Sequence, residues 1–372
     1  MIKFTINPYD VLFFGSGKPF NKGGNAKSIF PPFPNSIASS IFAKFYIETG
    51  IKINEEQGIY KAVYGPFIEK GGKIYFTAPM DILKEKKKEE KNNVITAVLK
   101  QEGFHLINIK DTDMGDKISG LLWEKSKDTE KDYEPFKGFI SFQGLINWYN
   151  EKEIKSEELI LSKDIFEYEN RVSINMDNEK QTVKEEDGLY MVNFVRLKKD
   201  VRLVFWVEAN YENDSLLSKN NIKKDEDLIK IFNKQPLVLK IGGESRSAGY
   251  EVKIDNFYDL FKKEDFKKNP SDSFTKVVFL TDGVFESPAN AKDNILDCTG
   301  SKILNGVLGE YILIGISSKN YSHLGNRTLR AIRAGSVLYF EKDSYSHKEG
   351  SYPIDFLNES RMFIGSNLVL YK

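Results

Sequence analysis

The residues with the clearest capacity for chemistry form a short segment, IGGESRSAGY, from Ile241 to Tyr250. Its glycines allow close approach of the backbone to a ligand, and the guanidinium and hydroxyl groups between them can donate hydrogen bonds to phosphate. The segment is not a dinucleotide-binding fingerprint. Its glycines do not have the G-x-G-x-x-G spacing, and a strand is predicted after it where the fingerprint would begin a helix. The pattern indicates an anion-binding loop, with a plain bulged hairpin as the alternative. The candidate residues of this glycine loop are Gly242, Gly243, Glu244, Ser245, Arg246 and Ser247.

A second candidate is the segment GNRTLRAIR, which contains Arg327, Arg330 and Arg333. The chain has only eight arginines against 46 lysines, so three arginines in so short a segment are a marked concentration. Guanidinium forks suit phosphate better than ammonium groups do. The segment is therefore a candidate for phosphate contact, assigned by charge alone, and a solvated positive turn is the alternative.

The net charge of zero, from 54 basic and 54 acidic residues, gives no sign of a nucleic-acid binder. The charges are nevertheless segregated along the chain. Residues 11–47 and 311–340 contain no Asp or Glu and carry four basic residues each, whereas residues 151–187 hold twelve acids against six bases. This pattern predicts one basic face and one acidic face. The basic residues of the first window are Lys18, Lys22, Lys27 and Lys44.

Several classes of site are disfavoured by composition. A single cysteine, Cys298, excludes an intramolecular disulfide and a multi-cysteine metal site, and it favours a cytoplasmic protein. The three histidines, at 105, 323 and 347, share no motif, so we expect no metal site, no cofactor and no catalytic residue. The pairs at 111/113 and 225/227 match DxD, but solvated charge is the simpler interpretation. No apolar run is long enough to span a membrane, so no membrane partner is predicted.

The spacing of apolar residues predicts the element that follows the first basic loop. Residues 2–14 are typical of a strand interrupted at Pro8, and a loop rich in Gly, Pro and Lys follows. A helix is then predicted, with Asn35 or Ser36 as its cap and Gly50 as its end. Helix N-termini after such loops favour phosphate, although a plain surface helix is an equal alternative. The side of this helix opposite its apolar residues carries Ser36, Ser39, Ser40 and Lys44.

The later pattern predicts an α+β fold. A hairpin turns at residues 70–72, two adjacent strands are indicated at 188–197 and 201–209, a helix at 224–234, and strands on both sides of the glycine loop. With the first strand and helix, this is the strand and helix order of a ferredoxin-like domain. We predict that residues 1–255 form this domain, with an insertion at about 83–165 and the glycine loop at 242–249, and that 256–372 form a second unit.

Six segments together resemble a known family. They are NPYDVLFFGSGKPF, FPNSIASSI, YGPFIEKGGKIYFTAPMDIL, RVSINMDNEKQTVKEEDGLY, the glycine loop and GNRTLRAIRAGSVLYFE. Their order resembles the repeat-associated mysterious proteins (RAMPs) of CRISPR systems, and more narrowly the third subunits of the type III-B Cmr effector complex. One departure is that the family's helix often has Gly where Ser39 or Ser40 stands.

The resemblance implies a non-catalytic subunit with two ferredoxin-like, RRM-like domains, acting in antiviral defence. Such a subunit holds the 5-prime repeat handle of the guide RNA, docks on the large polymerase- and cyclase-like signature subunit, and adjoins other RAMP subunits. The loop lysines, the helix start from Asn35 to Ser40 and the glycine loop then fall on motifs that line the RNA. Splayed RNA bases stack on aromatic rings, and the candidates for such stacking are Phe13, Phe14, Phe20 and Phe33.

Two other functions remain open. The related guide-processing endoribonuclease cleaves RNA without a metal, but residues 13–50 contain no histidine, and Tyr46 or Lys44 would be a poor base. His323 is the one histidine in a basic window. A scaffold that contacts only proteins is the third possibility, and it predicts that RNA retention is insensitive to reversal of the arginines near 330.

Overall fold

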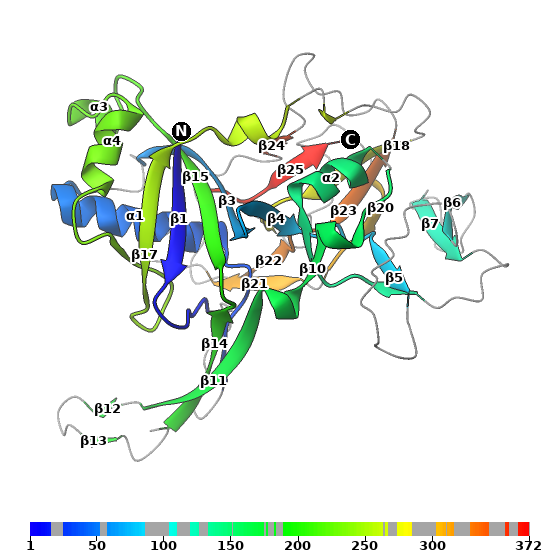
Figure 1. Cartoon of the computed structure of the whole chain (residues 1–372), viewed down its shortest axis with the longest axis horizontal. Coiled ribbons are helices and arrows are strands. Elements are labelled where there is room, and N and C mark those ends of the chain that lie inside the picture. The colour runs from blue at the N-terminus through cyan, green and yellow to red at the C-terminus, as the bar shows by residue number, and fades with distance from the viewer. Residues whose placement is uncertain are drawn as a thin grey trace.

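The computed structural model describes residues 1–15, 25–52, 58–85, 104–109, 120–125, 133–150, 152–174, 176–177, 182–183, 189–262, 265–266, 274–284, 303–309, 311–315, 328–341, 354–356 and 364–371. Figure 1 shows a body built around one large sheet, from which a pair of long strands projects. The fold is mixed α+β, consists mostly of antiparallel sheets and has few helices.

The large sheet has eight antiparallel strands in the order β10-β9-β4-β3-β15-β1-β17-β16. Its central strand β15 is buried on both faces, because nearly every position from Val201 to Ala209 is apolar. Phe4 on β1 lies opposite both Phe205 and Val252, which fixes the register of the centre. The strands are β1 (Ile2–Pro8), β3 (Tyr60–Lys70), β4 (Lys73–Thr77), β9 (Gly138–Ser141), β10 (Leu159–Leu161), β15 (Val201–Ala209), β16 (Val238–Lys240) and β17 (Ser247–Ile254).

Helix α1 (Pro34–Thr49) connects β1 to β3 and packs on the sheet through Ile37, Ile41 and Phe45, as the spacing predicts. It begins earlier than expected, because Phe33 is the cap and Pro34, whose fixed φ suits a first turn, is the first helical residue. Its end at Gly50, in the left-handed region with φ 71°, confirms the prediction. The other helices are α2 (Phe142–Tyr149), α3 (Leu216–Lys219), α4 (Asp225–Phe232) and the 3-10 turns η1 (Ser156–Glu158), η2 (Ser162–Asp164) and η3 (Phe257–Leu260).

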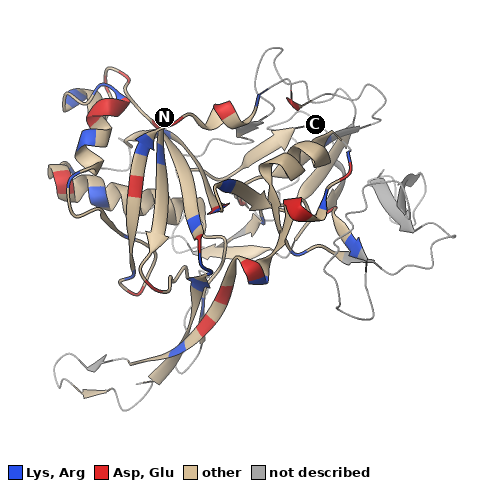
Figure 2. Cartoon of the chain, in the orientation of Figure 1, with Lys and Arg blue, Asp and Glu red and all other residues tan. Residues whose placement is uncertain are grey.

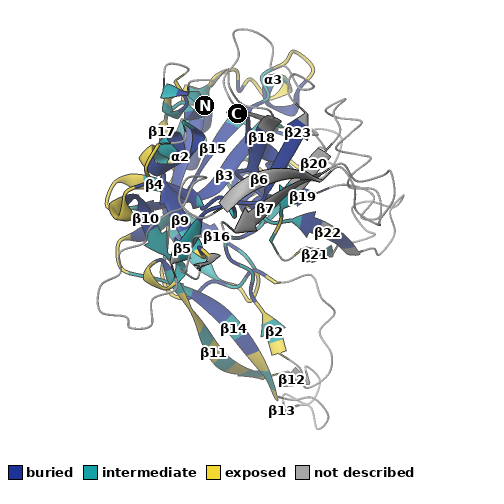
Figure 3. Cartoon of the chain, turned by 90° about the vertical axis from the view of Figure 1, so that its right-hand side faces the viewer, coloured by how far each residue is buried: buried dark blue, intermediate teal, exposed yellow. Residues whose placement is uncertain are grey.

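The projecting pair of strands, which we call the arm, consists of β11 (Phe166–Ile174) and β14 (Leu189–Leu197), with the short β2 (Asn25–Lys27) parallel to β14. Near its end lie β12 (Met176–Asp177) and β13 (Thr182–Val183). The two adjacent strands predicted around residue 199 both exist, but β14 pairs with β11 whereas β15 pairs with β1 and β3. The difference follows from burial, since β14 is exposed at its start and β15 is not (Figure 3).

Two further sheets belong to the C-terminal part of the chain. One has the order β20-β23-β18-β25-β24 and the other β19-β22-β21. Two short hairpins, β5-β8 and β6-β7, complete the strands that the structure describes. Their bounds are β5 (Leu83–Glu85), β6 (Phe104–Ile109), β7 (Gly120–Lys125), β8 (Tyr133–Pro135), β18 (Phe274–Phe279), β19 (Gly283–Val284), β20 (Ile303–Val307), β21 (Ile312–Gly315), β22 (Thr328–Ile332), β23 (Val337–Glu341), β24 (Ile354–Phe356) and β25 (Leu368–Tyr371).

Two cores lie on opposite faces of the large sheet. One packs the sheet against α1 and α4, and the other packs it against α2, η3 and the C-terminal strands. The region expected to be an insertion, 83–165, supplies β9, β10 and the fully buried Trp148 of α2 to the sheet and the second core. This second core also contains residues from both sides of the predicted boundary at 255, such as Trp206 and Tyr339.

A buried ion pair crosses the second core. Lys276 Nζ lies 2.6 Å from Asp81 Oδ2, and the side chains are 4% and 1% exposed. The other Asp81 oxygen accepts a hydrogen bond from Trp148 Nε1 at 2.8 Å, and Tyr339 donates to Oδ2 at 3.1 Å. The ammonium of Lys276 also lies 4.3 Å from the centre of the Trp148 ring. One carboxylate therefore joins the turn after β4, helix α2 and two C-terminal strands.

Candidate nucleic-acid interface

The glycine loop connects β16 to β17 and lies against the segment that follows β1. Gly242 has a φ of 70°, and a Cβ at this position would come within 2.2 Å of the carbonyl oxygen of Phe13. The Gly243 N–H donates to that same oxygen at 2.8 Å. These two glycines therefore permit close approach of the protein's own backbone, which is a different role from the ligand contact that the sequence suggested. Glu244 and Ser245, at φ 54° and 53°, form the exposed tip of the loop.

Arg246 is held between the glycine loop and the arm. Its guanidinium lies 4.4 Å from the centre of the Phe194 ring on β14, a cation–π contact. Among the described carboxylates, Asp10 is the one that Arg246 approaches. Its Nη1 lies 3.9 Å from Asp10 Oδ2, which is too far for a hydrogen bond. Its Nε is buried and has no hydrogen-bond partner within the described part of the chain. Arg246 is thus fixed in place while its hydrogen-bonding capacity is only partly used.

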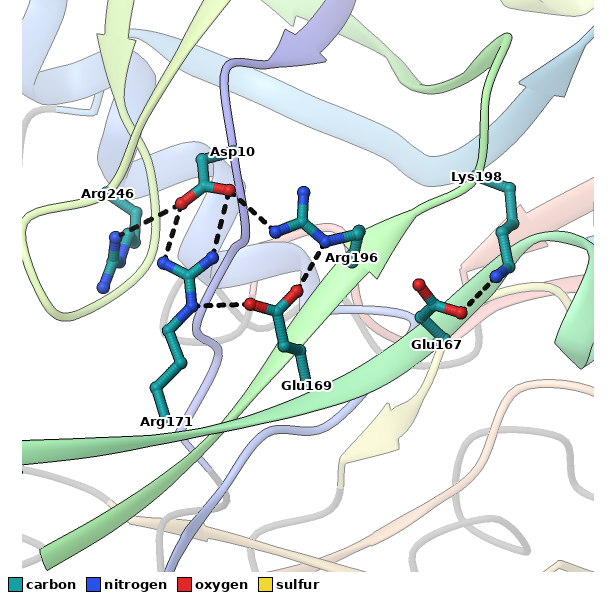
Figure 4. Close-up of polar contacts among 7 residues, drawn as sticks. All are labelled: Asp10, Glu167, Glu169, Arg171, Arg196, Lys198 and Arg246. Carbon is teal, nitrogen blue, oxygen red and sulfur yellow. Dashed lines mark hydrogen bonds and ion pairs between the residues drawn. The ribbon is translucent and has the colours of Figure 1, made fainter.

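Two arginines of the arm join Arg246 around Asp10, the second residue after the end of β1. Arg171 donates from Nη1 to Asp10 at 2.8 Å, and Arg196 donates from Nη2 at 3.0 Å. Both arginines also donate through Nε to Glu169, at 2.6 Å and 2.5 Å. Figure 4 shows the three guanidinium groups converging on these two carboxylates. We call these five residues the root cluster; its three positive and two negative groups give a formal charge of +1.

The arginines control the protonation of the acids in the root cluster. Hydrogen bonding from Arg171, followed by Arg196, lowers the pKa of Asp10 to about 2, against the opposing effect of burial. Hydrogen bonds from Arg196 and Arg171 likewise lower the pKa of Glu169. Both acids are therefore ionised at neutral pH. They orient the guanidinium groups and make poor general bases.

Strand pairing also explains why separate basic and acidic faces do not form at the arm. Residues 151–187 are acidic along the chain, but β14 places Arg196 opposite Glu167 in the register of the arm. Arg196 hydrogen-bonds to Glu169, and Lys198 pairs with Glu167. Figure 2 shows both signs of charge at the root of the arm. The predicted separation of basic and acidic surfaces is wrong at the arm. The prediction was made from charges that are close in sequence, whereas strand pairing places residues of opposite charge side by side.

The start of α1 lies beside a cleft. Its cap receives no side-chain hydrogen bond and its first turn holds no acid, an arrangement that favours an anion. The hydroxyl groups of Ser39 and Ser40 donate to the helix's own carbonyl oxygens of Asn35 and Ser36, at 2.8 Å and 3.0 Å. Ser39 is exposed, whereas Ser40 is buried. Asn35, Ser36 and Ser39 line a cleft of about 220 Å³ together with Phe14 and residues of β21.

Lys44 is buried, contrary to its expected place on a basic surface. Its ammonium lies 2.5 Å from Glu48 Oε1 and donates to the carbonyl oxygen of Pro236 at 2.9 Å, and the side chain is 5% exposed. Lys44 lies seven residues after Ile37 and three after Ile41, a helical spacing that places it on the buried side of α1, and its aliphatic stem allows it to pack there. Lys44 therefore joins α1 to the segment before β16. Lys27, on β2, is exposed as expected.

Arg333 likewise has internal partners. It lies 3.1 Å from Asp282 Oδ2 and donates to the carbonyl oxygen of Phe30 at 3.1 Å. Burial raises the pKa of Asp282, and the charge of Arg333 opposes that effect. Arg330 belongs to β22, where its backbone pairs opposite Leu313. Three predicted residues lie outside the described part of the chain: Lys18, Lys22 and Arg327.

The aromatic residues proposed for base stacking are buried or half-buried where they are described. Phe14 is 4% exposed, Phe13 packs edge-on against Phe194, and Phe33 packs in a small core with β21 and β22. Phe20 lies outside the described residues. An exposed aromatic that sequence reasoning missed is Tyr9, which is 65% exposed beside the root cluster.

Arg171 and Arg196 were missed as well, although arginine is rare enough in this chain to draw attention to them. Three of its eight arginines, including Arg246, meet at the root cluster. Among the described residues, no group of three His, Cys, Asp or Glu is placed to hold a metal ion. In the same part of the chain, no helix has both the length and the hydropathy needed to cross a bilayer.

A family model described as "CRISPR-associated protein (Cas_Cmr3)" matches residues 4–370. No curated protein matches the chain. A chain in the cryo-EM structure of the type III-B Cmr-beta bound to cognate target RNA and AMPPnP is 20% identical with a TM-score of 0.49, over 91% of this chain and 86% of that chain. A chain in the crystal structure of the Csm3-Csm4 subcomplex of the type III-A CRISPR-Cas interference complex is 13% identical with a TM-score of 0.45, over 100% of both chains. Both similarities are weak.

Proposed function

Because the chain belongs to the CRISPR-associated Cas_Cmr3 family, the third subunits of type III-B Cmr effectors, we propose that it binds the 5-prime repeat handle of the guide RNA. In this proposal it also docks on the large polymerase-like signature subunit and adjoins other RAMP subunits. The surface that binds RNA comprises the glycine loop, the root cluster and the start of α1.

The observation that carries the proposal is the state of Arg246. Its guanidinium is fixed against Phe194, its side chain is 27% exposed, and its Nη1 lies 3.9 Å from Asp10 Oδ2, which is too far for a hydrogen bond. A guanidinium held in this way is pre-organised for a phosphate oxygen. Arg171 and Arg196 stand beside it and leave the cluster with a formal charge of +1. A local group of this kind binds phosphate whatever the net charge of the chain.

The proposal includes no catalytic step. RNA cleavage without a metal needs a general base and a general acid that titrate near neutral pH. The root cluster offers arginines, which do not release a proton, and carboxylates whose pKa values are lowered. Groups of this kind hold a phosphodiester in place and do not transfer protons to or from it.

The proposed fold has two ferredoxin-like domains. In chain order β1, α1, β3, β15, α4 and β17 follow a β-α-β-β-α-β pattern, and the sheet places these strands as β3-β15-β1-β17. This supports a ferredoxin-like arrangement for the first domain. The described residues from 274 to 371 form strands, so the assignment of the second domain depends on the family.

The test measures RNA retention as a function of salt. We expect Arg246→Ala to weaken binding of the handle RNA and to reduce the slope of log K against log salt by about 0.7 to 0.9, the value for one lost phosphate contact. Arg202→Ala is the matched control, because Arg202 is 37% exposed and pairs with Glu69 away from the root cluster.

The RNA that co-purifies with the full chain from its host identifies the function. A common, short, repeat-derived 5-prime end, together with a large co-purifying subunit, supports the proposal. Protein partners without RNA would favour a scaffold that contacts only proteins. Cleaved repeat RNA without partners would favour an endoribonuclease.

A further inference from the structure

The end of β1 presents an exposed aromatic residue next in sequence to Asp10 of the root cluster. Tyr9 follows Pro8, the last residue of β1, and its side chain is 65% exposed. In the register of the sheet, Pro8 lies opposite Ala248 and Asn7 opposite Gly249 of β17. Tyr9 therefore stands where β1 leaves the sheet, next in sequence to the carboxylate that joins the three arginines.

One side of the Tyr9 ring lies on the backbone of Gly249. A Cβ added to Gly249 would come within 3.2 Å of the Tyr9 hydroxyl oxygen and 3.5 Å of two ring carbons. The missing side chain at Gly249 thus leaves the space that the ring occupies. With this support on one side and 65% of the side chain exposed, the ring offers a flat apolar surface to a ligand.

We infer that Tyr9 is a stacking platform for one base of a single-stranded RNA whose phosphates contact the root cluster. The inference rests on the proposed function and adds a specific contact to it. Splayed bases of single-stranded RNA stack on exposed aromatic rings, while arginines hold the phosphates. Of the phenylalanines first considered, Phe14 is 4% exposed, and Phe13 and Phe33 are half-buried against neighbouring side chains, so each offers less open ring surface than Tyr9.

The location distinguishes Tyr9 from other exposed aromatic residues. Tyr46 is 47% exposed, but it lies in the second half of α1, near the end opposite Phe33. Tyr9 immediately precedes Asp10, to which Arg171, Arg196 and Arg246 all point. A base on Tyr9 and a phosphate on the root cluster can therefore belong to one short stretch of RNA.

The test uses the full chain and handle RNAs that carry 2-aminopurine at one position at a time. Its fluorescence is quenched when the base stacks, so each position reports its own contact. We expect Tyr9→Ala to weaken RNA binding by about 5- to 150-fold and to raise the fluorescence at one position. Tyr9→Phe should behave as wild type. Tyr46→Ala is the matched control and should change neither quantity.

Further readouts separate stacking from other roles. Tyr9→Leu keeps apolar cover over Gly249 without an aromatic ring, so it should lose binding as Tyr9→Ala does while it keeps the circular dichroism spectrum of the wild type. The salt slope should stay unchanged in both variants, because no phosphate contact is lost.

Two results would overturn the inference. If Tyr9→Ala and Tyr9→Leu bind RNA like Tyr46→Ala and alter fluorescence at no position, Tyr9 is no stacking platform. The proposed function then survives only if Arg246→Ala still weakens binding. If wild-type chain binds no handle RNA at low salt, the proposed function and the inference fail together.

Discussion

Replacement of Asp81 by Asn should destabilise the whole chain, because this carboxylate joins segments that are far apart in sequence. Asp81 lies 2.6 Å from Lys276 and accepts hydrogen bonds from Trp148 and Tyr339. Two of these partners belong to C-terminal strands, and Trp148 belongs to the region expected to be an insertion. The prediction therefore tests whether these parts unfold as one unit.

The geometry sets the size of the effect. At 2.6 Å, two unit charges in an effective dielectric of about 20 attract each other by about 6 kcal/mol. Desolvation offsets much of this, and removal of one partner from a buried pair costs about 3–5 kcal/mol. The Trp148 ring, 4.3 Å from the ammonium, retains part of the stabilisation of Lys276. We therefore expect a loss of about 3 kcal/mol for Asp81→Asn, and a decrease in Tm of about 4 °C for 372 residues.

The assay is urea unfolding followed by tryptophan fluorescence and by far-ultraviolet circular dichroism. Asp81→Asn, Lys276→Met and the double variant form a cycle, in which we expect a coupling energy of about 2 kcal/mol. Lys230→Met is the matched control, because Lys230 pairs with Asp227 at 3.7 Å and is 78% exposed, so its removal should cost less than about 0.5 kcal/mol. Single effects that simply add in the double variant would refute the reasoning. Separate transitions for the two probes would show independent units.

Two further predictions concern the site and its neighbour. The pKa of Asp10 is lowered to about 2, so its stabilisation of the arm is complete above its unfolded value of about 3.9 and is lost as pH falls towards 2. Amide hydrogen exchange of β11 and β14, corrected for the intrinsic effect of pH, should therefore lose protection over this range, and the loss should be smaller in Asp10→Asn, where only Glu169 still loses its charge beside the two arginines; the same loss in both would contradict the assignment. Lys44→Met should lower the free energy of unfolding by about 1–3 kcal/mol without changing the salt slope of RNA binding, measured by denaturation and by titration. A shallower slope would show that Lys44 reaches a phosphate.

Much of the first part of the fold could be predicted, because its patterns are local. The apolar spacing of Ile37, Ile41 and Phe45 and the stop at Gly50 defined α1 to within two or three residues at its start. The strands predicted at 188–197 and 201–209 were also recognisable, but their pairing was not. Alternation shows which side of a strand is apolar, and it does not show which strand lies next to it. Pairing depends on burial across the whole sheet, which placed β15 at the centre and β14 in the arm.

The candidate site was predictable only where its residues were contiguous. The glycine loop was recognised: its tip is exposed, and its Arg246 belongs to the root cluster. Arg171 and Arg196 were missed because they are 25 positions apart and meet only through the register of the arm. Lys44 was predicted to lie on a basic surface because of its charge. Its position on α1 instead places it among buried residues. Arg333 was counted as a surface charge, although Asp282, which pairs with it, is 51 residues away.

A net charge of zero is compatible with recognition of a polyanion when acids serve to orient bases. In the root cluster, Asp10 and Glu169 each accept hydrogen bonds from two guanidinium groups, which restricts the arginines without cancelling their charge. An arginine that is already ordered loses less entropy when it binds phosphate than a free surface lysine does. The two acids thus reduce the net positive charge of the root cluster. They also reduce the entropy that its arginines lose when they bind a phosphate. For the same reason, the pI of about 6.9 says little about which molecules the chain binds. The unfilled hydrogen-bonding capacity of Arg246 is the more informative observation.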